Sequence, residues 1–129
     1  MTTSAWTSDE LTKIETAEEL EIASLRGDGT LRKPRTIWVV RVGDDLYVRS
    51  VNGRGSDWFR GVITRHEGHI EAGGVSKDVT FMEVDVDDPI NTQIDDVYRA
   101  KYRRYSASII NTTLTPKAHS ATIKLVPRP

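Results

Sequence analysis

The first feature of this sequence is the absence of cysteine. With no cysteine among 129 residues, the chain cannot form disulfides, thiolate nucleophiles or zinc and iron–sulfur sites held by cysteine. It also lacks an apolar run long enough to span a bilayer. Its opening residues, MTTSAWTSDELTK, contain no basic segment followed by an apolar one, as a secretory signal would. We therefore expect a cytoplasmic protein with no membrane partner.

An excess of charge of one sign is also missing. The 18 basic and 19 acidic residues leave a formal net charge of −1, whereas a dedicated nucleic-acid binder normally carries a large basic excess. We expect no nucleic-acid partner. The basic residues are nevertheless clustered, and local basic pockets on a neutral protein suit a small anionic ligand. The first cluster contains Arg26, Arg32, Lys33 and Arg35.

The order of the predicted elements indicates a small barrel. Thr7 and Glu10 have the spacing of a capping box, which predicts a short helix. Further helices are predicted from residue 58, after Asp88-Pro89, and over 106–112. Alternating or β-branched runs predict strands over 20–25, 36–42, 46–51, 69–73, 75–86 and 121–126. We predict one α+β domain over residues 1–129, with six mostly antiparallel strands closed as a small β-barrel and flanked by helices.

A glycine-rich loop, VNGRGSDW, joins the hairpin at residues 36–51 to the helix that follows. Gly53 and Gly55 allow backbone amides to approach an anion, Arg54 offers a guanidinium, and the helix N-terminus adds positive potential. The same residue types also make an ordinary hairpin exit with Ser56 or Asp57 as helix cap. Both interpretations are open at this point.

Three other side chains are candidates for acid–base chemistry. His66 has a near-neutral reference pKa, although a solvated histidine at a helix end is the simpler interpretation. His66 and His69 lack a third converging ligand in the sequence, so no metal site is predicted. Tyr98 and Tyr102 share one helix stripe, where packing is the default role of tyrosine. If that stripe lines a groove, either hydroxyl could donate to a substrate oxygen.

Several stretches resemble the split barrels that bind FMN or deazaflavin, a superfamily that includes pyridoxamine-phosphate-oxidase-like and deazaflavin-dependent nitroreductase-like proteins. Pro34-Arg35-Thr36 precedes an apolar strand and a hairpin, and Trp58 opens a helix after the glycine loop. The segments 97–102, 115–118 and 121–127 are similar to a narrower, DUF2255-like branch. This resemblance covers nearly the whole chain.

The resemblance implies a split β-barrel that forms a homodimer, with FMN or deazaflavin in a groove between subunits. It also implies a flavin- or deazaflavin-dependent oxidoreductase acting on a small organic substrate. Two alternatives stay open: a cofactor-independent isomerase, cyclase or lyase that uses the same pocket for acid–base chemistry, and a non-catalytic small-ligand-binding module. Transferred onto this sequence, the cofactor-binding positions are Arg35, Thr36, Trp38, Ser50, Asn52, Gly53, Arg54, Ser56 and Trp58, and the catalytic candidates are Tyr98, His66 and Tyr102.

Overall fold

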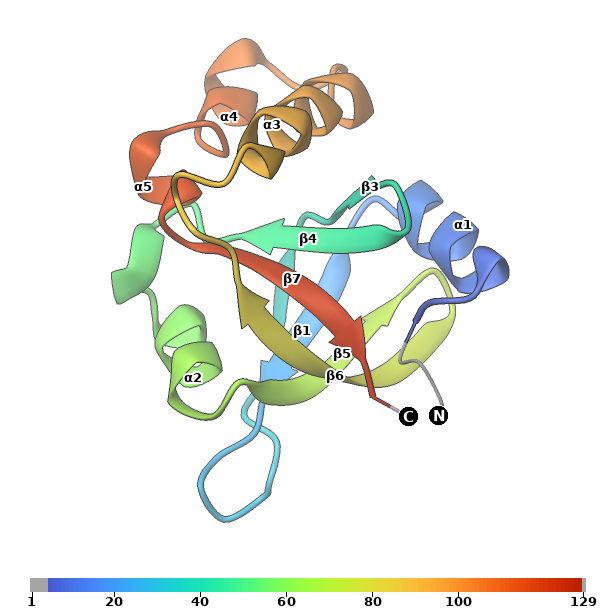
Figure 1. Ribbon diagram of the computed structural model, residues 1–129, viewed down its shortest axis with the longest axis vertical. Helices are drawn as coiled ribbons and strands as arrows, with labels where there is room; N and C mark the ends of the chain where they lie inside the picture. Colours follow the sequence, from blue (N-terminus) through green and yellow to red (C-terminus); the bar gives the residue numbers. More distant parts are fainter. Residues whose placement is uncertain (1–4, 129) are drawn as a thin grey trace.

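Seven strands form one antiparallel sheet in the order β2-β1-β5-β6-β7-β4-β3. The computed structural model describes residues 5–128, so the first four residues of the sequence and the last lie outside it. Figure 1 shows the sheet curled into a barrel. The strands are β1 (Leu20–Ser24), β2 (Arg35–Ile37), β3 (Val40–Val42), β4 (Asp45–Arg49), β5 (Glu67–Ala72), β6 (Val75–Glu83) and β7 (Thr122–Pro127).

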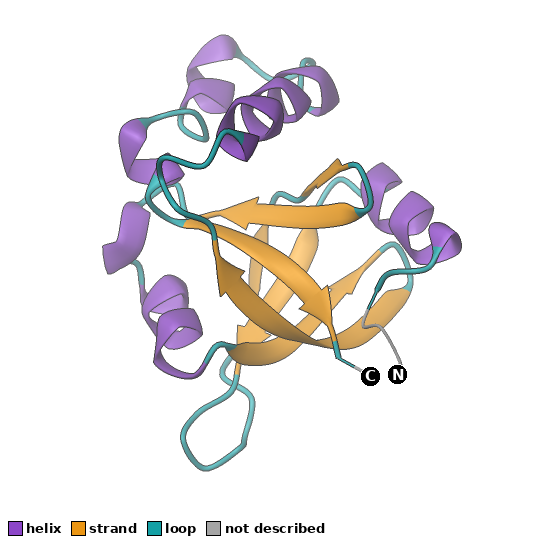
Figure 2. Ribbon diagram, in the orientation of Figure 1, coloured by secondary structure: helices purple, strands orange, loops and turns teal. Residues whose placement is uncertain are grey.

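Helices cover the outside and the ends of this sheet (Figure 2). The helices are α1 (Ser8–Thr16), α2 (Asp57–Arg65), α3 (Ile90–Lys101), α4 (Ala107–Asn111) and α5 (Pro116–His119), with a 3₁₀ turn η1 at Gly53–Gly55. The three helices of the C-terminal part, α3 to α5, lie together at one end of the barrel (Figure 1). No helix within residues 5–128 has both the length and the apolarity to cross a bilayer.

The prediction of one strand over residues 36–42 is wrong, and this changes the strand count from six to seven. β2 pairs with β1 at one edge of the sheet, whereas β3 pairs with β4 at the other edge. Only Trp38 and Val39 separate the two strands. The chain therefore passes from one sheet edge to the other within two residues, which requires the edges to lie close together and curls the sheet into the predicted split barrel.

Side chains from α3 and the turn after it hold the break between β2 and β3. The Tyr102 hydroxyl accepts a hydrogen bond from the Val39 amide at 3.2 Å and donates to the Glu18 carbonyl at 2.7 Å. The Lys101 ammonium donates to the Val39 carbonyl at 2.6 Å. Backbone groups that leave a ladder need other partners when they are buried, and these two side chains supply them.

Most of the locally encoded elements are confirmed. The Thr7 hydroxyl accepts from the Glu10 amide at 3.1 Å, and the Thr7 amide donates to the Glu10 carboxylate at 2.9 Å, which completes the capping box. The Asp88 carboxylate accepts from the Ile90 amide at 2.9 Å at the start of α3. Helix α5 was not predicted, although Thr115 before Pro116 caps it through a hydrogen bond from the Ala118 amide.

Two apolar clusters show how the barrel and its helices are packed. The first fills the barrel and includes Leu46 and Val48 of β4. The second lies between the outer face of the sheet and the C-terminal helices, and it includes Tyr47. Because both faces of β4 are covered, the side chain of Arg49 is completely buried next to the second cluster. A buried guanidinium is tolerated only when its donors are satisfied.

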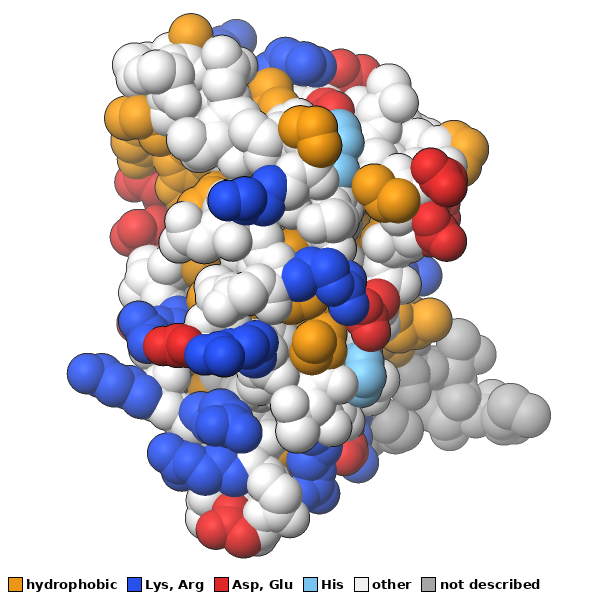
Figure 3. Space-filling view, turned by 90° about the vertical axis from the view of Figure 1, so that its left-hand side faces the viewer, with side chains coloured by type: hydrophobic (Ala, Val, Ile, Leu, Met, Phe, Trp, Pro, Cys, Tyr) orange, Lys and Arg blue, Asp and Glu red, His pale blue; other side chains and the backbone are white. Residues whose placement is uncertain are grey.

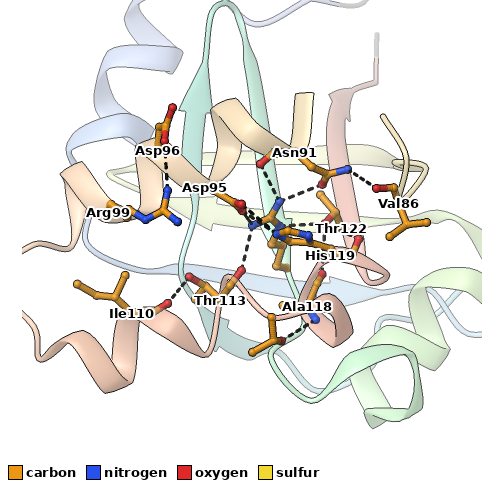
Figure 4. A network of polar contacts seen from close by, with 12 residues as sticks. Val86, Asn91, Asp95, Asp96, Arg99, Ile110, Thr113, Ala118, His119 and Thr122 are labelled. Carbon is orange, nitrogen blue, oxygen red and sulfur yellow. Dashed lines mark hydrogen bonds and ion pairs between the residues drawn. The ribbon is translucent and has the colours of Figure 1, made fainter. Parts of the chain in front are cut away.

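All five N–H donors of Arg49 have partners, which come from three separate segments. Figure 4 labels these partners, which are Asn91, Asp95, Thr113 and Thr122. Nε donates to Thr122 Oγ1 at 3.0 Å, and Nη2 donates to Asn91 Oδ1 at 2.9 Å and to the Asn91 carbonyl at 3.3 Å. Nη1 donates to the Asp95 carboxylate and, at 2.9 Å, to the Thr113 carbonyl. This network fastens α3 and the segment before α5 to strands β4 and β7.

Replacing Arg49 with alanine should lower the free energy of unfolding by about 3–5 kcal/mol, because it breaks a largely buried ion pair and leaves Asp95 with His119 as its remaining partner. Urea denaturation followed by circular dichroism measures this change. Arg60→Ala is the matched control, since its ion pair with Asp57 is exposed and is worth about 1 kcal/mol or less. Equal losses in the two variants would contradict the structural role given to Arg49.

Candidate functional site

Trp58, in the first turn of α2, lies at the junction of three neighbouring hollows. Its indole is half-buried and contacts the Phe59 ring edge-on, with 5.8 Å between centroids. The glycine loop places Trp58 there, because α2 begins directly after that loop at Asp57. One aromatic side chain is therefore shared by pockets of different chemistry.

The first hollow, here called the aromatic pocket, has a volume of about 200 Å³. Trp38 stacks on Tyr102 at one wall, with ring centroids 3.8 Å apart and an angle of 4° between the planes. The wall formed by α3 and α4 contributes Tyr98 and Ile109. Thr36, Ile37, Trp38, Arg49, Ser50, Val51, Asn52, Trp58, Tyr98, Ile109, Thr112 and Thr113 line the pocket.

The second hollow, here called the basic pocket, has a volume of about 170 Å³ and lies on the other side of Trp58. Four cationic side chains line it against one carboxylate, that of Asp57. Lys and Arg side chains gather in the lower part of the face seen in Figure 3, towards the loop between β1 and β2. The pocket is lined by Ile22, Ala23, Ser24, Arg26, Arg32, Lys33, Arg35, Asp57, Trp58 and Val62.

Arg32 of the basic pocket has an unusual feature. Its Nε is buried and has no hydrogen-bond partner in the part of the chain that the structure describes. Within residues 5–128, Arg32, Lys33 and Arg35 also make no ion pair with a carboxylate. An unpaired buried donor costs free energy, so this pocket has the charge and the donor to receive an anion.

Asp28 of the neighbouring turn does not oppose that charge from within the pocket. Its carboxylate accepts hydrogen bonds from the Thr30 hydroxyl at 2.7 Å and the Thr30 amide at 3.0 Å. These bonds hold the pKa of Asp28 below its usual range. The carboxylate therefore closes its own turn and is not among the groups that line the basic pocket.

The glycine loop lies at a third hollow, which shares lining residues with each of the other two and contains Arg35, Asn52, Gly55, Ser56, Asp57 and Trp58. Gly53 adopts a φ of 79° and packs against Lys117, so it lines none of the three hollows. Ser56 occupies the N-cap position, but its hydroxyl bonds that of Ser50 at 2.8 Å instead of capping the helix.

The structure does not bring Arg54 to Arg35, although both were predicted to bind the cofactor in one groove. The Arg54 guanidinium donates to the Ser120 carbonyl at 2.9 Å and to the Glu83 carboxylate at 2.8 Å. It lines a separate hollow on that side of the molecule. The Glu83 carboxylate, which is distant in sequence, thus determines the direction of the Arg54 side chain. Of the two arginines, Arg35 lines hollows next to Trp58 and Arg54 does not.

Of the three catalytic candidates, Tyr98 and Tyr102 are neighbours with ring centroids 6.1 Å apart, and His66 lies away from both. Tyr98 lines the aromatic pocket, and its ring lies 5.6 Å from the Arg49 guanidinium. The Tyr102 hydroxyl is engaged by Val39 and Glu18. Burial raises the pKa of both phenols, which makes them poor proton donors. His66 lies away from the Trp58 hollows and pairs with Glu83 at 3.0 Å.

His66 ends α2 through its backbone, which adopts the left-handed conformation. His66 has a φ of 62° and donates its amide to the Val62 carbonyl, whereas Gly68 lies inside β5. His69 bonds Asp78 at 2.8 Å and Ser76 at 2.7 Å. Residues 5–128 contain no group of three histidine, aspartate or glutamate side chains arranged to hold a metal ion.

The predicted site residues did not include Arg26, Arg32 and Lys33. The signal was present, since these residues and Arg35 form the basic cluster in the sequence. The structure shows that the cluster is a pocket because the β1–β2 loop folds towards α2. Gly61 of α2 allows this approach, since a Cβ there would lie 2.4 Å from Ser24 Oγ and 3.0 Å from Arg32 Nε.

The comparisons with known proteins agree with the fold. The family described as "Uncharacterized protein conserved in bacteria (DUF2255)" matches residues 10–125. None of the curated proteins matches the sequence. Solved structures that share the fold are those of the pyridoxamine-phosphate-oxidase-like split barrel.

Three of these solved structures are informative. A provisionally named pyridoxamine 5′-phosphate oxidase from Listeria innocua superposes with a TM-score of 0.65 at 17% identity, over 92% of this chain and 90% of that chain. An FAD-binding protein from Mesorhizobium loti superposes with a TM-score of 0.58 at 16% identity, over 100% of this chain and 95% of that chain. A protein named F420 reductase superposes with a TM-score of 0.55 at 16% identity, over 92% of this chain and 90% of that chain. These identities establish a shared fold.

The cluster of Glu83, His66 and Arg54 should make stability depend on acidity. Hydrogen bonds from His66 and then Arg54 lower the pKa of Glu83. A lowered folded-state pKa means that ionised Glu83 stabilises the fold above its unfolded pKa, and this contribution is lost as pH falls. Between about pH 6 and pH 3, urea unfolding should show a larger loss for the wild type than for Glu83→Gln.

Glu71→Gln is the control for this pH series, because Glu71 is exposed and has no ion-pair partner among residues 5–128. It should keep the wild-type dependence on pH. If the free energy of unfolding fell equally with pH in the wild type and in Glu83→Gln, the cluster would not contribute to the pH dependence of stability.

Proposed function

Because the chain belongs to the DUF2255 family and has the split-barrel fold, we propose that it binds FMN or a deazaflavin and acts as an oxidoreductase on a small organic substrate. The observation that carries the proposal is the buried, unpartnered Nε of Arg32 in a basic pocket beside Trp58. That donor and its neighbouring cations fit the anionic end of a flavin-type cofactor.

The basic pocket is proposed to hold the cofactor phosphate. Arg32, Lys33 and Arg35 are free of carboxylates among the described residues, so their charge is available to the ligand. Guanidinium groups suit phosphate because they offer paired N–H donors in a planar fork. The N-terminus of α2 faces the same region through the hollow that contains Ser56, and it adds positive potential there.

The aromatic pocket is proposed to hold the flat ring system. Trp58 borders both pockets, so a ligand could extend past it with its ring on one side and its phosphate on the other. Trp38 and Trp58 supply aromatic walls, and Ser50, Asn52 and Thr36 supply polar groups for ring heteroatoms. Pockets of this kind are mostly apolar with a few placed polar groups.

When bound, such a cofactor supplies hydride transfer to or from a substrate. The residues of this chain would bind, orient and exclude water. Tyr98 forms part of the wall of the aromatic pocket, and its raised pKa keeps its phenol protonated. The cofactor-free alternative needs an acid–base pair in the pocket, and no observation favours it, because His66 pairs with Glu83 elsewhere.

We further propose that the working form is a homodimer whose second copy covers the open side of the aromatic pocket. Val51 and Ile109 line that pocket and are 43% and 47% exposed. Such large apolar side chains at the rim of a pocket favour contact with another surface.

The binding proposal is tested by titrating the protein with FMN and with F420 while its tryptophan fluorescence is measured. The double variant Arg32→Gln/Arg35→Gln should bind about tenfold to a hundredfold more weakly than the wild type, as expected for loss of charged hydrogen bonds. Arg103→Gln is the control, because Arg103 is exposed and lies outside the three hollows.

Absence of binding to both cofactors would overturn the proposal. Equal weakening by Arg103→Gln would show that only general charge attracts the ligand. Tight binding without reduction of the cofactor by any donor would leave a ligand-binding module in place of an oxidoreductase.

The dimer is tested by light scattering coupled to size-exclusion chromatography. The wild type should elute with twice the monomer mass, and Ile109→Asp should shift the equilibrium towards the monomer because it places a charge at the apolar rim. Met82→Asp is the control, since Met82 is 50% exposed but does not line the aromatic pocket. A wild type that stays monomeric at high concentration would refute the proposal.

A further inference from the structure

Lys101, the last residue of α3, is a half-buried amine without an ion-pair partner among residues 5–128. Its Nζ donates one hydrogen bond, to the Val39 carbonyl at 2.6 Å, and lies 5.2 Å from the centre of the Tyr102 ring. The carbonyl and the ring restrict where the amine points. They do not consume the electron pair that the neutral amine would carry.

This amine opens into a hollow that is separate from those at Trp58. The hollow has a volume of about 280 Å³ and lies between the C-terminal ends of α1 and α3. It has room for a small organic molecule beside the Nζ atom. Its lining consists of Glu15, Thr16, Glu18, Lys101, Tyr102 and Arg104.

The ionic groups of the hollow other than Lys101 already have partners. Glu15 pairs with Arg41 at 3.2 Å, and Glu18 accepts from Arg104 and from the Tyr105 hydroxyl. Arg41 and Arg104 are thus already bound to carboxylates, and an anionic ligand would face the carboxylates of Glu15 and Glu18. An uncharged ligand avoids that repulsion, and a cationic product next to the amine would be attracted to both carboxylates.

Burial lowers the pKa of Lys101 to about 8, against the opposing influence of Glu15 and Glu18. Roughly a tenth of such an amine is neutral at pH 7, compared with less than about a thousandth for an ordinary lysine. Since only the neutral amine is nucleophilic, desolvation activates a lysine for attack on carbonyl carbon. The physical basis is the hollow itself, which keeps the ammonium partly out of water.

We propose that Lys101 is a nucleophile that forms a reversible imine with a small uncharged aldehyde bound in this hollow. The Nζ lone pair attacks the carbonyl carbon, a C–N bond forms, and the carbonyl oxygen takes up a proton. The resulting carbinolamine loses water, so that aldehyde and ammonium give a protonated imine and one water molecule. No oxidant or reductant takes part, and Glu15 and Glu18 stabilise the positive charge of the product.

The proposal does not depend on cofactor binding, and its test uses the whole protein. Propionaldehyde and cyanoborohydride at pH 7 convert any imine into a stable propyl-lysine, which peptide mass spectrometry locates. Lys101 should be labelled at least about tenfold faster than the exposed Lys33 and Lys117, because its neutral fraction is larger. Its labelling rate should rise with pH and level off above about pH 8.

Two controls separate a built site from general lysine reactivity. Lys101→Arg keeps a cation that can donate to Val39, and it should lose the fast-labelled position while leaving FMN or F420 binding unchanged. Unfolding in urea should reduce the rate at Lys101 to that of the other lysines.

Equal labelling of Lys101, Lys33 and Lys117 in the folded protein would overturn the proposal. So would a Lys101 that titrates near pH 8 by NMR but forms no adduct, because the hollow would then lower the pKa without admitting an aldehyde.

Discussion

The structure depends on one constraint, which is that Trp38 and Val39 alone connect the two opposite edges of the sheet. A sheet whose edge strands are joined by so short a link cannot stay open, and its edges meet without a shared ladder. The Val39 backbone then needs partners from elsewhere, and Tyr102 and Lys101 provide them. The same link directs Trp38 into the aromatic pocket. Barrel closure, one wall of the proposed cofactor site and the position of the Lys101 amine thus share a cause.

Two regions of the molecule differ in character. Around Trp58, cations from the β1–β2 loop face an aromatic pocket, a combination suited to a ligand with one anionic and one planar end. Around Lys101, the half-buried amine shares its hollow with two carboxylates and the Arg104 guanidinium. The net charge of −1 reveals neither the four cations of the basic pocket nor the balanced charges around Lys101. Local charge therefore says more about ligands than the total does.

Elements defined by neighbouring residues could be predicted from the sequence, and features defined by distant partners could not. The capping box at Thr7 and the cluster that became the basic pocket are both local. In contrast, the apolar run over residues 36–42 has uniform strand propensity, and only its separate pairing partners divide it. Arg54 has the setting of a phosphate ligand in the sequence, yet Glu83, 29 residues away, determines its direction. The interior position of Arg49 likewise requires α3 and β7 to be in place.

The Arg49 network has a consequence for how a ligand would enter. Its five donors join α3, the segment before α5 and β7 to the barrel through buried bonds, so the C-terminal helices cannot lift away singly without exposing an unpaired guanidinium. Amide hydrogens of α3 and of β4 would consequently exchange with solvent in one cooperative opening rather than separately. The wall that α3 contributes to the aromatic pocket is therefore fixed, so a ligand would enter the pocket without displacing α3.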